Sequence, residues 1–314
     1  MRFLWSSRKR STGWMAIATQ GNRVDLAHVS RGAGGRPEVS SLVSYRKEGP
    51  VANALAILRR QHGLGNFRCV TALGVGEYQI LQLEAPGVPP AEIREAVRWR
   101  IKDMIDYPPE TATIDIAELP TSQTGTSRTR SLHVFCARND VVGGRMKLFE
   151  AAKIPLEVID VPEMALRNVA TLWAKPRQAL ALISFDAAGG TLVIVADGEL
   201  YTTRRIEVTE GDLADGNHEQ RHSHMERVAL EMQRSFDHYD RQFGAFPLER
   251  LIVAAPQAAE LIDYLRPILY VPVEAADLSG IMDFPAVPEL RDPDRQAQSL
   301  VTLGLALRMQ GGGA

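Results

Sequence analysis

Cysteine and long apolar runs are the two features this sequence has least of. Only two cysteines occur among 314 residues, Cys69 and Cys136, and they are too far apart to form a CxxC pair. This usage fits a reducing compartment and argues against a disulfide framework or a cysteine-rich metal site. No apolar run approaches the roughly 18–20 residues that span a bilayer, and the longest, such as 179–185, have the length of strands. We therefore expect a soluble, intracellular protein.

The sequence also lacks the common catalytic and nucleotide-binding motifs. It contains no GxxxxGK[ST] loop, no GxGxxG loop and no GxSxG elbow, and neither cysteine lies near a recognisable histidine partner. The formal net charge of −2 gives no general attraction to nucleic acid. The basic pairs Arg128/Arg130 and Arg204/Arg205 have no interleaved aromatic residues. We therefore expect solvated surface at these pairs and no nucleic-acid site.

One metal-binding pattern is present, but in the wrong context. Residues 218–222 have the sequence HEQRH and match the HExxH pattern of zinc peptidases, which needs both histidines on one face of a helix. A Gly/Asp-rich segment precedes the pattern, and residues 223–226 (SHME) form a capping box that predicts a helix start at about Ser223. We therefore expect His218 and His222 to lie in or next to a loop, and we predict no metal site.

The order of predicted elements repeats once along the chain. Three apolar strands with short turns, then a helix, then a further strand occur in each half, about 165 residues apart. The strands of the first copy are predicted at 14–19, 24–29, 39–45 and 68–73, and those of the second at 179–185, 191–196, 200–208 and 248–255. Such a duplication predicts an α/β protein with two lobes and a cleft between them.

Extra material separates the two copies. Residues 91–105 have apolar side chains at three- and four-residue steps, which predicts an amphipathic helix, and strand patterns flank it. We therefore predict a first lobe at 1–178 that contains a small α+β inserted subdomain at about 77–159, and a second lobe at 179–314. The aromatic and basic residues of 1–10 are a candidate for peripheral contact with an anionic membrane; the alternative is a frayed terminus.

Four segments resemble one protein family. They are 92–109 (an EIREAVRW helix that runs into IDYPP), 149–161, the DGELYTTR hairpin at 197–204, and EMQRSFDHY at 231–239. In this order they are similar to segments of the PilM/MshI family of type IV pilus biogenesis proteins, MshI serving mannose-sensitive haemagglutinin (MSHA) pili, within the actin-like ATPase superfamily. The resemblance implies an actin-like fold of two ribonuclease-H-like lobes, which agrees with the duplication.

The resemblance also implies where a nucleotide would bind. Two glycine turns would hold the phosphates, and their counterparts here are Gly21 and Asn22 in the first lobe and, in the second, Asp186, Gly189, Gly190 and Thr191. The first turn has no aspartate, the second has a shifted one, and the expected Ser-Gly-Gly at the adenosine position is 254–256 (AAP). Proline has no N–H to donate, and Cβ atoms obstruct close approach. We therefore expect a degenerate pocket, a pseudo-ATPase with no catalytic residue and no bound cofactor; the alternative is an actin-like ATPase switched by ATP and Mg²⁺.

A partner is implied as well. The family docks the N-terminal cytoplasmic tail of a bitopic inner-membrane protein, PilN or its MshJ-like counterpart, in a groove beside the insert, at the cytoplasmic face of the inner membrane. Aromatic and arginine side chains are good anchors, so the expected contact residues are Arg98, Trp99, Tyr107 and Pro108; the alternative is that Trp99 and Tyr107 belong to the core. A more remote relative is the cytoplasmic part of the type II secretion protein GspL, which leaves a secretion component as a further alternative.

Overall fold

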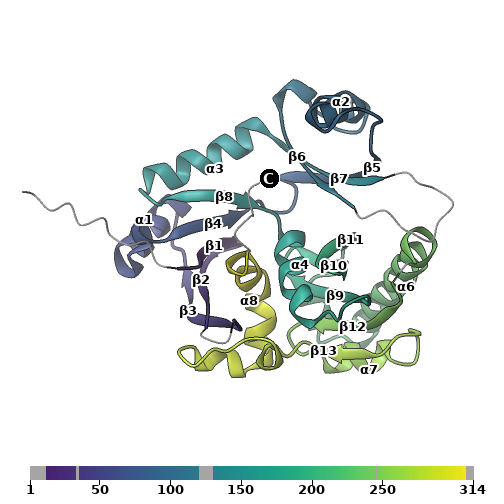
Figure 1. The fold of residues 1–314 in the computed structure, drawn as a ribbon. Coiled ribbons are helices and arrows are strands. Elements are labelled where there is room, and N and C mark those ends of the chain that lie inside the picture. The colour runs from purple at the N-terminus through teal and green to yellow at the C-terminus, as the bar shows by residue number, and fades with distance from the viewer. Residues whose placement is uncertain (1–11, 33–34, 120–129, 245, 309–314) are drawn as a thin grey trace, which may run out of the picture.

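Two five-stranded sheets and a smaller three-stranded sheet form the framework of the protein (Figure 1). The computed structural model describes residues 12–32, 35–119, 130–244 and 246–308. The candidate membrane segment 1–10 and Arg128 lie outside the described residues. In the first sheet the strand order is β3 (Pro37–Arg46), β2 (Arg23–Arg31), β1 (Trp14–Gln20), β4 (Arg68–Ala72) and β8 (Leu156–Asp160). In the second it is β11 (Glu199–Ile206), β10 (Gly189–Ala196), β9 (Ala179–Asp186), β12 (Leu248–Ala254) and β13 (Val273–Ala275).

The two large sheets confirm the predicted duplication. In the first, β1 pairs antiparallel with β2, β2 antiparallel with β3, and β1 parallel with β4. In the second, β9, β10, β11 and β12 repeat this pattern in the same order. We call the first sheet with its helices the first lobe and the second sheet with its helices the second lobe.

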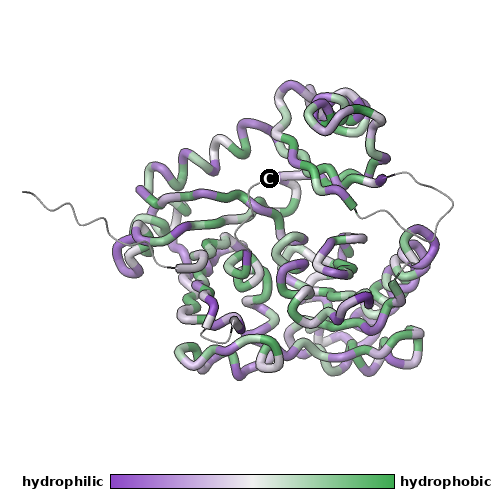
Figure 2. Tube along the Cα trace, in the orientation of Figure 1, coloured by the Kyte–Doolittle hydropathy of each residue, from purple (hydrophilic) through white to green (hydrophobic). Residues whose placement is uncertain are grey.

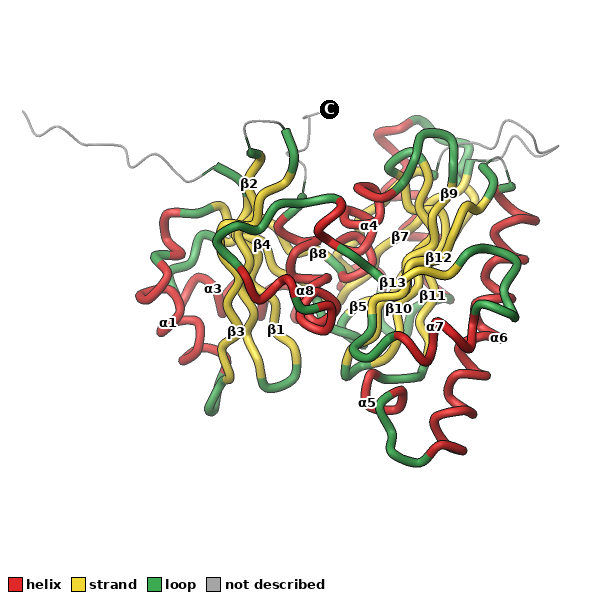
Figure 3. Tube along the Cα trace, turned by 90° about the horizontal axis from the view of Figure 1, so that it is seen from below, coloured by secondary structure: helices red, strands yellow, loops and turns green. Residues whose placement is uncertain are grey.

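Each sheet has helices on both faces. The outer face of the first lobe is covered by α1 (Val51–His62) and α3 (Asn139–Ala151), and that of the second by α6 (His218–Phe243) and α7 (Ala259–Leu265). Two helices, α4 (Pro162–Trp173) and α8 (Pro293–Ala306), lie between the sheets and pack on each other (Figure 3). The short α5 (Glu210–Leu213) precedes α6, and turns of 3-10 helix lie at Leu64–Asn66, Pro90–Glu92, Ile101–Asp103, Pro109–Thr111, Leu278–Gly280 and Pro288–Arg291.

The side chains of β1 explain how close these layers come. Successive side chains of a strand point to opposite faces. Met15 and Ile17 point outward and pack with α1, whereas Ala16 and Ala18 join the core that lies between the two sheets. Small residues on the inner face let α8 approach the sheet. In Figure 2 the strands are mainly coloured as hydrophobic, whereas the outer helices carry both hydrophobic and hydrophilic residues. The core between the sheets contains residues of both lobes, so it holds them together.

The third sheet is the body of the insert. Its order is β5 (Tyr78–Glu84), β7 (Ser131–Arg138) and β6 (Ala112–Glu118), and α2 (Ile93–Arg100) packs on one face (Figure 1). The following β8 belongs to the first large sheet, where it pairs with β4. The division of the chain into two lobes at residue 178 stays a prediction. Helix α8 belongs to the predicted second lobe by sequence, but it packs against β1 and β2 of the first lobe.

The insert also contacts the second lobe. His133 on β7 is buried, and its Nε2 lies 3.3 Å from the backbone oxygen of Tyr201 on β11. Leu119, which follows β6, is part of the core of the second lobe. Burial lowers the pKa of His133, which favours the neutral imidazole at this contact. The insert is therefore a bridge between the lobes.

None of the helices in the described residues combines the length and the hydrophobicity that a membrane span requires.

Candidate functional site

The first predicted phosphate turn joins β1 to β2. Gly21 has a positive φ of 53°, and no described atom lies within 4 Å of the position its Cβ would take, so the turn is open on this side. The Asn22 carbonyl accepts a hydrogen bond from the Lys47 amide at 2.8 Å. Arg23 donates to the side chains of Gln20 and Asp25, each at 3.1 Å. The turn is thus bordered by an arginine that is already paired with a carboxylate.

Asp25 is a carboxylate that the sequence analysis missed. It lies on β2, is only 2% exposed, and accepts hydrogen bonds from Arg23 and from the Ser44 hydroxyl. Its pairing partner on β1 is Ala18. The Asp25 carboxylate is thus already hydrogen-bonded to Arg23 and Ser44, so its acceptor atoms are engaged within the first lobe.

The second predicted phosphate turn joins β9 to β10. Asp186 accepts a hydrogen bond from the Ala188 amide at 2.7 Å, which closes the turn on itself. The Thr191 hydroxyl accepts from Arg205 at 2.6 Å, and the same guanidinium lies 3.4 Å from the Ala188 carbonyl. An arginine of β11 therefore binds the polar atoms that border this turn.

The two glycines of this turn have a packing role. A Cβ at Gly189 would lie 2.6 Å from the Ile206 carbonyl, and its φ of 126° is one that other residues rarely adopt. A Cβ at Gly190 would lie 2.8 Å from the Phe185 ring. Close approach to β11 and to Phe185 thus requires glycine at both positions, independently of any phosphate.

The predicted adenosine-binding segment, residues 254–256 at the end of β12, is also engaged in internal contacts. The amide of Gln257 donates to Asp294 of α8 at 2.9 Å, and Pro256 has no amide hydrogen. The adjacent cavity of about 390 Å³ has an apolar wall that includes Ala254, Ala255 and Ala297. No backbone N–H of residues 256–257 is left to face a ligand.

A buried polar cluster lies where the insert, α4 and the second lobe meet. The Tyr78 hydroxyl on β5 donates to Glu163 of α4 at 2.5 Å, and Glu163 is only 2% exposed. Burial is the main cause that raises the pKa of Glu163, and the charge of Arg205 opposes it. The pKa of Tyr78 is raised by its own burial and by the nearby carboxylate. At the end of β8, three residues before Glu163, burial raises the pKa of Asp160, which pairs with Arg308.

Replacing Glu163 by glutamine should change the pH dependence of stability. Glu163 has an ordinary pKa of 4.5 when unfolded and a higher pKa when folded. The folded state therefore binds more protons, and the wild type loses stability as pH rises from 4.5 through the folded pKa. Glu163→Gln keeps an acceptor for Tyr78 and removes this loss. Urea unfolding at a series of pH values should show that the free energy of unfolding of the variant rises relative to that of the wild type as pH increases. Parallel curves of unfolding free energy against pH would contradict the raised pKa of Glu163 in the folded state.

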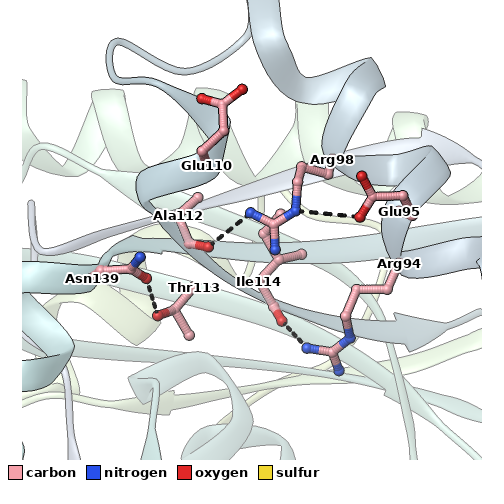
Figure 4. Close-up of a pocket in the computed structure, with 8 residues that line it drawn as sticks. All are labelled: Arg94, Glu95, Arg98, Glu110, Ala112, Thr113, Ile114 and Asn139. Atoms are coloured by element: carbon pink, nitrogen blue, oxygen red, sulfur yellow. Dashed lines mark hydrogen bonds and ion pairs between the residues drawn. The ribbon is translucent and has the colours of Figure 1, made fainter.

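An open groove of about 520 Å³ lies where the insert meets the first lobe (Figure 4). Arg94 and Arg98 of α2 reach over β6, one of the two edge strands of the insert sheet in the described residues. Arg94 donates to the Ile114 carbonyl at 2.5 Å, and Arg98 donates to the Ala112 carbonyl at 3.2 Å and to that of Pro109. The remaining wall is formed by Glu95, Glu110, Thr113 and Asn139. Asn139 begins α3, so both the insert and the first lobe contribute to the groove.

The four expected partner-binding residues lie in different environments. Arg98 lines the groove, and Trp99, the next residue on α2, is 66% exposed. Pro108 is exposed at the surface. Tyr107 is 9% exposed and belongs to the core of the insert, with Arg138 over its ring, so the core alternative holds for Tyr107. Of the expected partner-binding residues, Arg98, Trp99 and Pro108 are therefore accessible at the surface.

The predicted helix start at Ser223 is wrong. The side chain of Asn217 accepts hydrogen bonds from the amides of Glu219 and Gln220, and α6 begins at His218. His218 and His222 therefore lie on one helix, with their rings stacked 6.2 Å apart. In the described part of the chain, no group of three or more metal-ligating side chains is placed to hold a metal ion.

Comparison with known proteins gives the class of fold. No protein-family model and no curated protein matches the chain. A Bacteroides thetaiotaomicron protein described as having an actin-like ATPase fold and unknown function is similar, with a TM-score of 0.50 and 8% identity over 95% of this chain and 98% of that one. The two duplicated lobes described above, together with this likeness, define the chain as one with the actin-like fold.

Two further solved structures are similar over nearly their whole length. One is the PilM–PilN type IV pilus biogenesis complex, with a TM-score of 0.73 and 20% identity over 95% of this chain and 98% of that one. The other is the cytoplasmic domain of EpsL, an inner membrane component of the Vibrio cholerae type II secretion system, with a TM-score of 0.52 and 9% identity over 95% and 97%. The resemblance to PilM that four segments of the sequence indicate is thus confirmed at the level of the fold.

Proposed function

We propose that this chain is a scaffold of type IV pilus assembly, in an MSHA-type system, that works at the cytoplasmic face of the inner membrane. In this role it binds the N-terminal cytoplasmic tail of a bitopic inner-membrane partner of the PilN or MshJ kind. The proposal is supported by the likeness in fold to PilM in its complex with PilN and by the four similar sequence segments.

The groove beside the insert is the observation that carries the proposal. Its walls come from two parts of the protein, and on β6 the carbonyls of Ile114 and Ala112 accept hydrogen bonds from the side chains of Arg94 and Arg98. Arg94 is 61% exposed, and a guanidinium has five N–H donors, so donors remain at the groove wall beyond those bound to Ile114 and Asp115. An extended tail presents backbone carbonyls at regular spacing, and such donors bind them.

The surface of α2 continues this groove toward Trp99. Residues three and four apart share a helix face, and Glu95, which lines the groove, is one turn from both Arg98 and Trp99. Trp99 is 66% exposed, and tryptophan is enriched among the residues that contribute most of the binding energy at protein interfaces. We propose that the tail leaves the groove across Glu95 and places an apolar side chain on Trp99, with Pro108 at the margin.

We further propose that partner binding is independent of nucleotide. Asp186 and Thr191 of the second turn are bound by Ala188 and Arg205, and Gly189 and Gly190 are required for packing. Gly21 and Asn22 form the first turn, but the arginine beside it is paired with Asp25. A triphosphate would have to compete with these internal contacts for the same donors, which favours a vestigial pocket without ATP or Mg²⁺.

Titration of a labelled tail peptide tests the proposal. Peptides of the N-terminal cytoplasmic segments of the host's bitopic pilus and type II secretion proteins are added to the purified chain and followed by fluorescence anisotropy. A pilus tail should bind with a Kd of about 1 μM or tighter, which corresponds to roughly 8 kcal/mol. Binding only by the secretion tail would assign the protein to type II secretion, and binding by neither would overturn the scaffold.

A second candidate function is an ATP-switched protein with the same fold. It is favoured by the open side of the Gly21 turn and by the carboxylate of Asp186 at the opposite turn. ATP with Mg²⁺ would then raise the melting temperature, and Asp186→Ala would abolish the rise. We expect no rise in the wild type.

A further inference from the structure

An open pocket on the outer face of the first lobe shares no lining residue with the insert groove. It has a volume of about 490 Å³, and strands β1, β2 and β3 contribute to its wall. Met15 and Phe67 form the apolar part of the wall. Hydroxyl and imidazole side chains form the rest: Thr12, His28, Ser30, Ser40, Ser41 and His62. The pocket therefore combines hydroxyl groups with imidazoles, two residue types of nucleophilic catalysis.

A β-bulge places Ser40 in this pocket. His28 on β2 pairs with Ser41 on β3, and the next pair is Val29 with Val39, which leaves Ser40 as an extra residue in β3. Bulges are common next to active sites, where they redirect a side chain. Ser40 is exposed, and its Oγ lies 2.5 Å from Nδ1 of His28, which is only 7% exposed. The bulge thus brings an accessible hydroxyl to a buried imidazole.

The hydrogen bonds of His28 set the direction of its contact with Ser40. Burial is the main cause that lowers the pKa of His28, and the hydrogen bond to Thr12 opposes it, so the neutral imidazole is favoured. Nε2 lies 2.9 Å from the Thr12 backbone oxygen, which can only accept, so Nε2 carries the ring hydrogen. Nδ1 is then an acceptor, and the Ser40 hydroxyl donates to it. The same hydroxyl lies farther, 3.3 Å, from the His28 carbonyl.

This arrangement has the parts of an activated nucleophile. A hydroxyl is activated when it donates to a base whose other nitrogen is held by a third group, and here Thr12 holds His28. The side chains of Ser30, Ser41 and His62 line the same pocket, and none of them is hydrogen-bonded to another described residue. Free donors of this kind can stabilise the negative charge that develops on an acyl oxygen. The pocket thus supplies a nucleophile, a base and further donors.

We propose that Ser40 is a nucleophile with His28 as its general base, and that the pocket takes an activated carboxylic ester with a small acyl group. Ser40 Oγ attacks the carbonyl carbon and forms the O–C bond, while its proton passes to His28 Nδ1. The bond from that carbon to the leaving oxygen then breaks, and Nδ1 returns the proton to the leaving alcohol. The product is an acyl ester of Ser40. This modification site is independent of the proposed scaffold function.

Labelling of the full chain tests the proposal. A fluorophosphonate probe forms an O–P bond with a nucleophilic serine and releases fluoride, and peptide mass spectrometry identifies the labelled residues. Ser279 is a matched internal control, because it is also exposed but its hydroxyl donates to the Asp277 carboxylate at 2.6 Å instead of to an imidazole. Ser40 should be labelled at least about 100-fold faster than Ser279, since a general base contributes that much or more. A smaller ratio, or no label on Ser40, would overturn the proposal.

An ester and two variants test the substrate class and the base. p-Nitrophenyl acetate should give a burst of p-nitrophenol that Ser40→Ala abolishes and Ser279→Ala leaves unchanged. His28→Gln keeps a polar side chain but cannot take a proton, so it should slow labelling of Ser40 at least about 100-fold. Where His28→Gln fails to fold, Ser40→Ala still tests the proposal, because Ser40 is exposed. No burst in the wild type, a burst that persists in Ser40→Ala, or undiminished labelling in His28→Gln would overturn the proposal.

Discussion

Replacing Gly304 by alanine is expected to destabilise the protein by about 3 kcal/mol, at the upper end of overpacking effects. Gly304 lies on α8 and faces α4, and its backbone carbonyl accepts from the Asn168 side chain at 3.0 Å. A Cβ at this position would overlap the backbone carbonyl of Ala165. Backbone cannot move aside as a flexible side chain can, so the two helices between the lobes would have to separate. Urea unfolding measures the change.

The matched control is the same substitution at a glycine with space around it. Gly143 is within α3, and no described atom lies within 4 Å of the position its Cβ would take. Gly143→Ala should therefore leave stability unchanged or raise it by about 0.5–1 kcal/mol, because alanine loses less backbone entropy in a helix. Equal effects of the two substitutions would show that α4 and α8 do not pack as closely as described.

Trp99→Ala is expected to weaken binding of the partner tail by about 30-fold, which corresponds to the roughly 2 kcal/mol of an interface hot spot. Trp99 is 66% exposed, so its removal should leave the unfolding transition unchanged. A loss of affinity without loss of stability would place the tail on this part of α2. The measurement is the anisotropy titration with wild type and variant in parallel.

Met146→Ala provides the control for nonspecific apolar contact. Met146 lies on α3, is 58% exposed, and is not part of the groove wall. Its truncation should leave tail affinity within about a factor of two of the wild type, as for most surface positions away from hot spots. If Met146→Ala weakened binding of the tail as much as Trp99→Ala does, the proposed path of the tail across Glu95 to Trp99 would be wrong.

The fold could be predicted because its signals are local. Turn residues and alternating apolar strands recur in both halves, and the sheets pair accordingly. The start of α6 could not be decided from local signals, because two segments have a capping pattern. Residues 217–220 (NHEQ) and 223–226 (SHME) each offer a capping side chain followed three residues later by Gln or Glu. The structure uses Asn217, the earlier one.

The candidate site could be predicted only in part, because its contacts join distant segments. Tyr78 and Glu163 are 85 residues apart, and neither neighbourhood in the sequence reveals the other. For Trp99 the sequence analysis left the core alternative open, although the helix period could have decided it: Ile93, Val97 and Ile101 define the buried face, and Trp99 points away from it. Tyr107 follows the helix, where that period no longer applies, and it is buried.

The glycine turn after β9 shows a similar limit. The sequence resembles a phosphate turn that has lost some of its acidic residues, and glycine would serve phosphate binding or packing equally well. Only the positions of the Phe185 ring and the Ile206 carbonyl show that packing requires Gly189 and Gly190. The arginine that reaches this turn, Arg205, comes from another strand.

The tail titration repeated with and without saturating ATP and Mg²⁺ tests the central claim most directly. The account predicts one Kd under both conditions, because the groove at Arg94 and Arg98 contains no residue of the glycine turns and Arg205 already binds Thr191 beside the second turn. A tail that binds only with ATP and Mg²⁺, or whose Kd changes more than about tenfold, a coupling of roughly 1.4 kcal/mol, would contradict it.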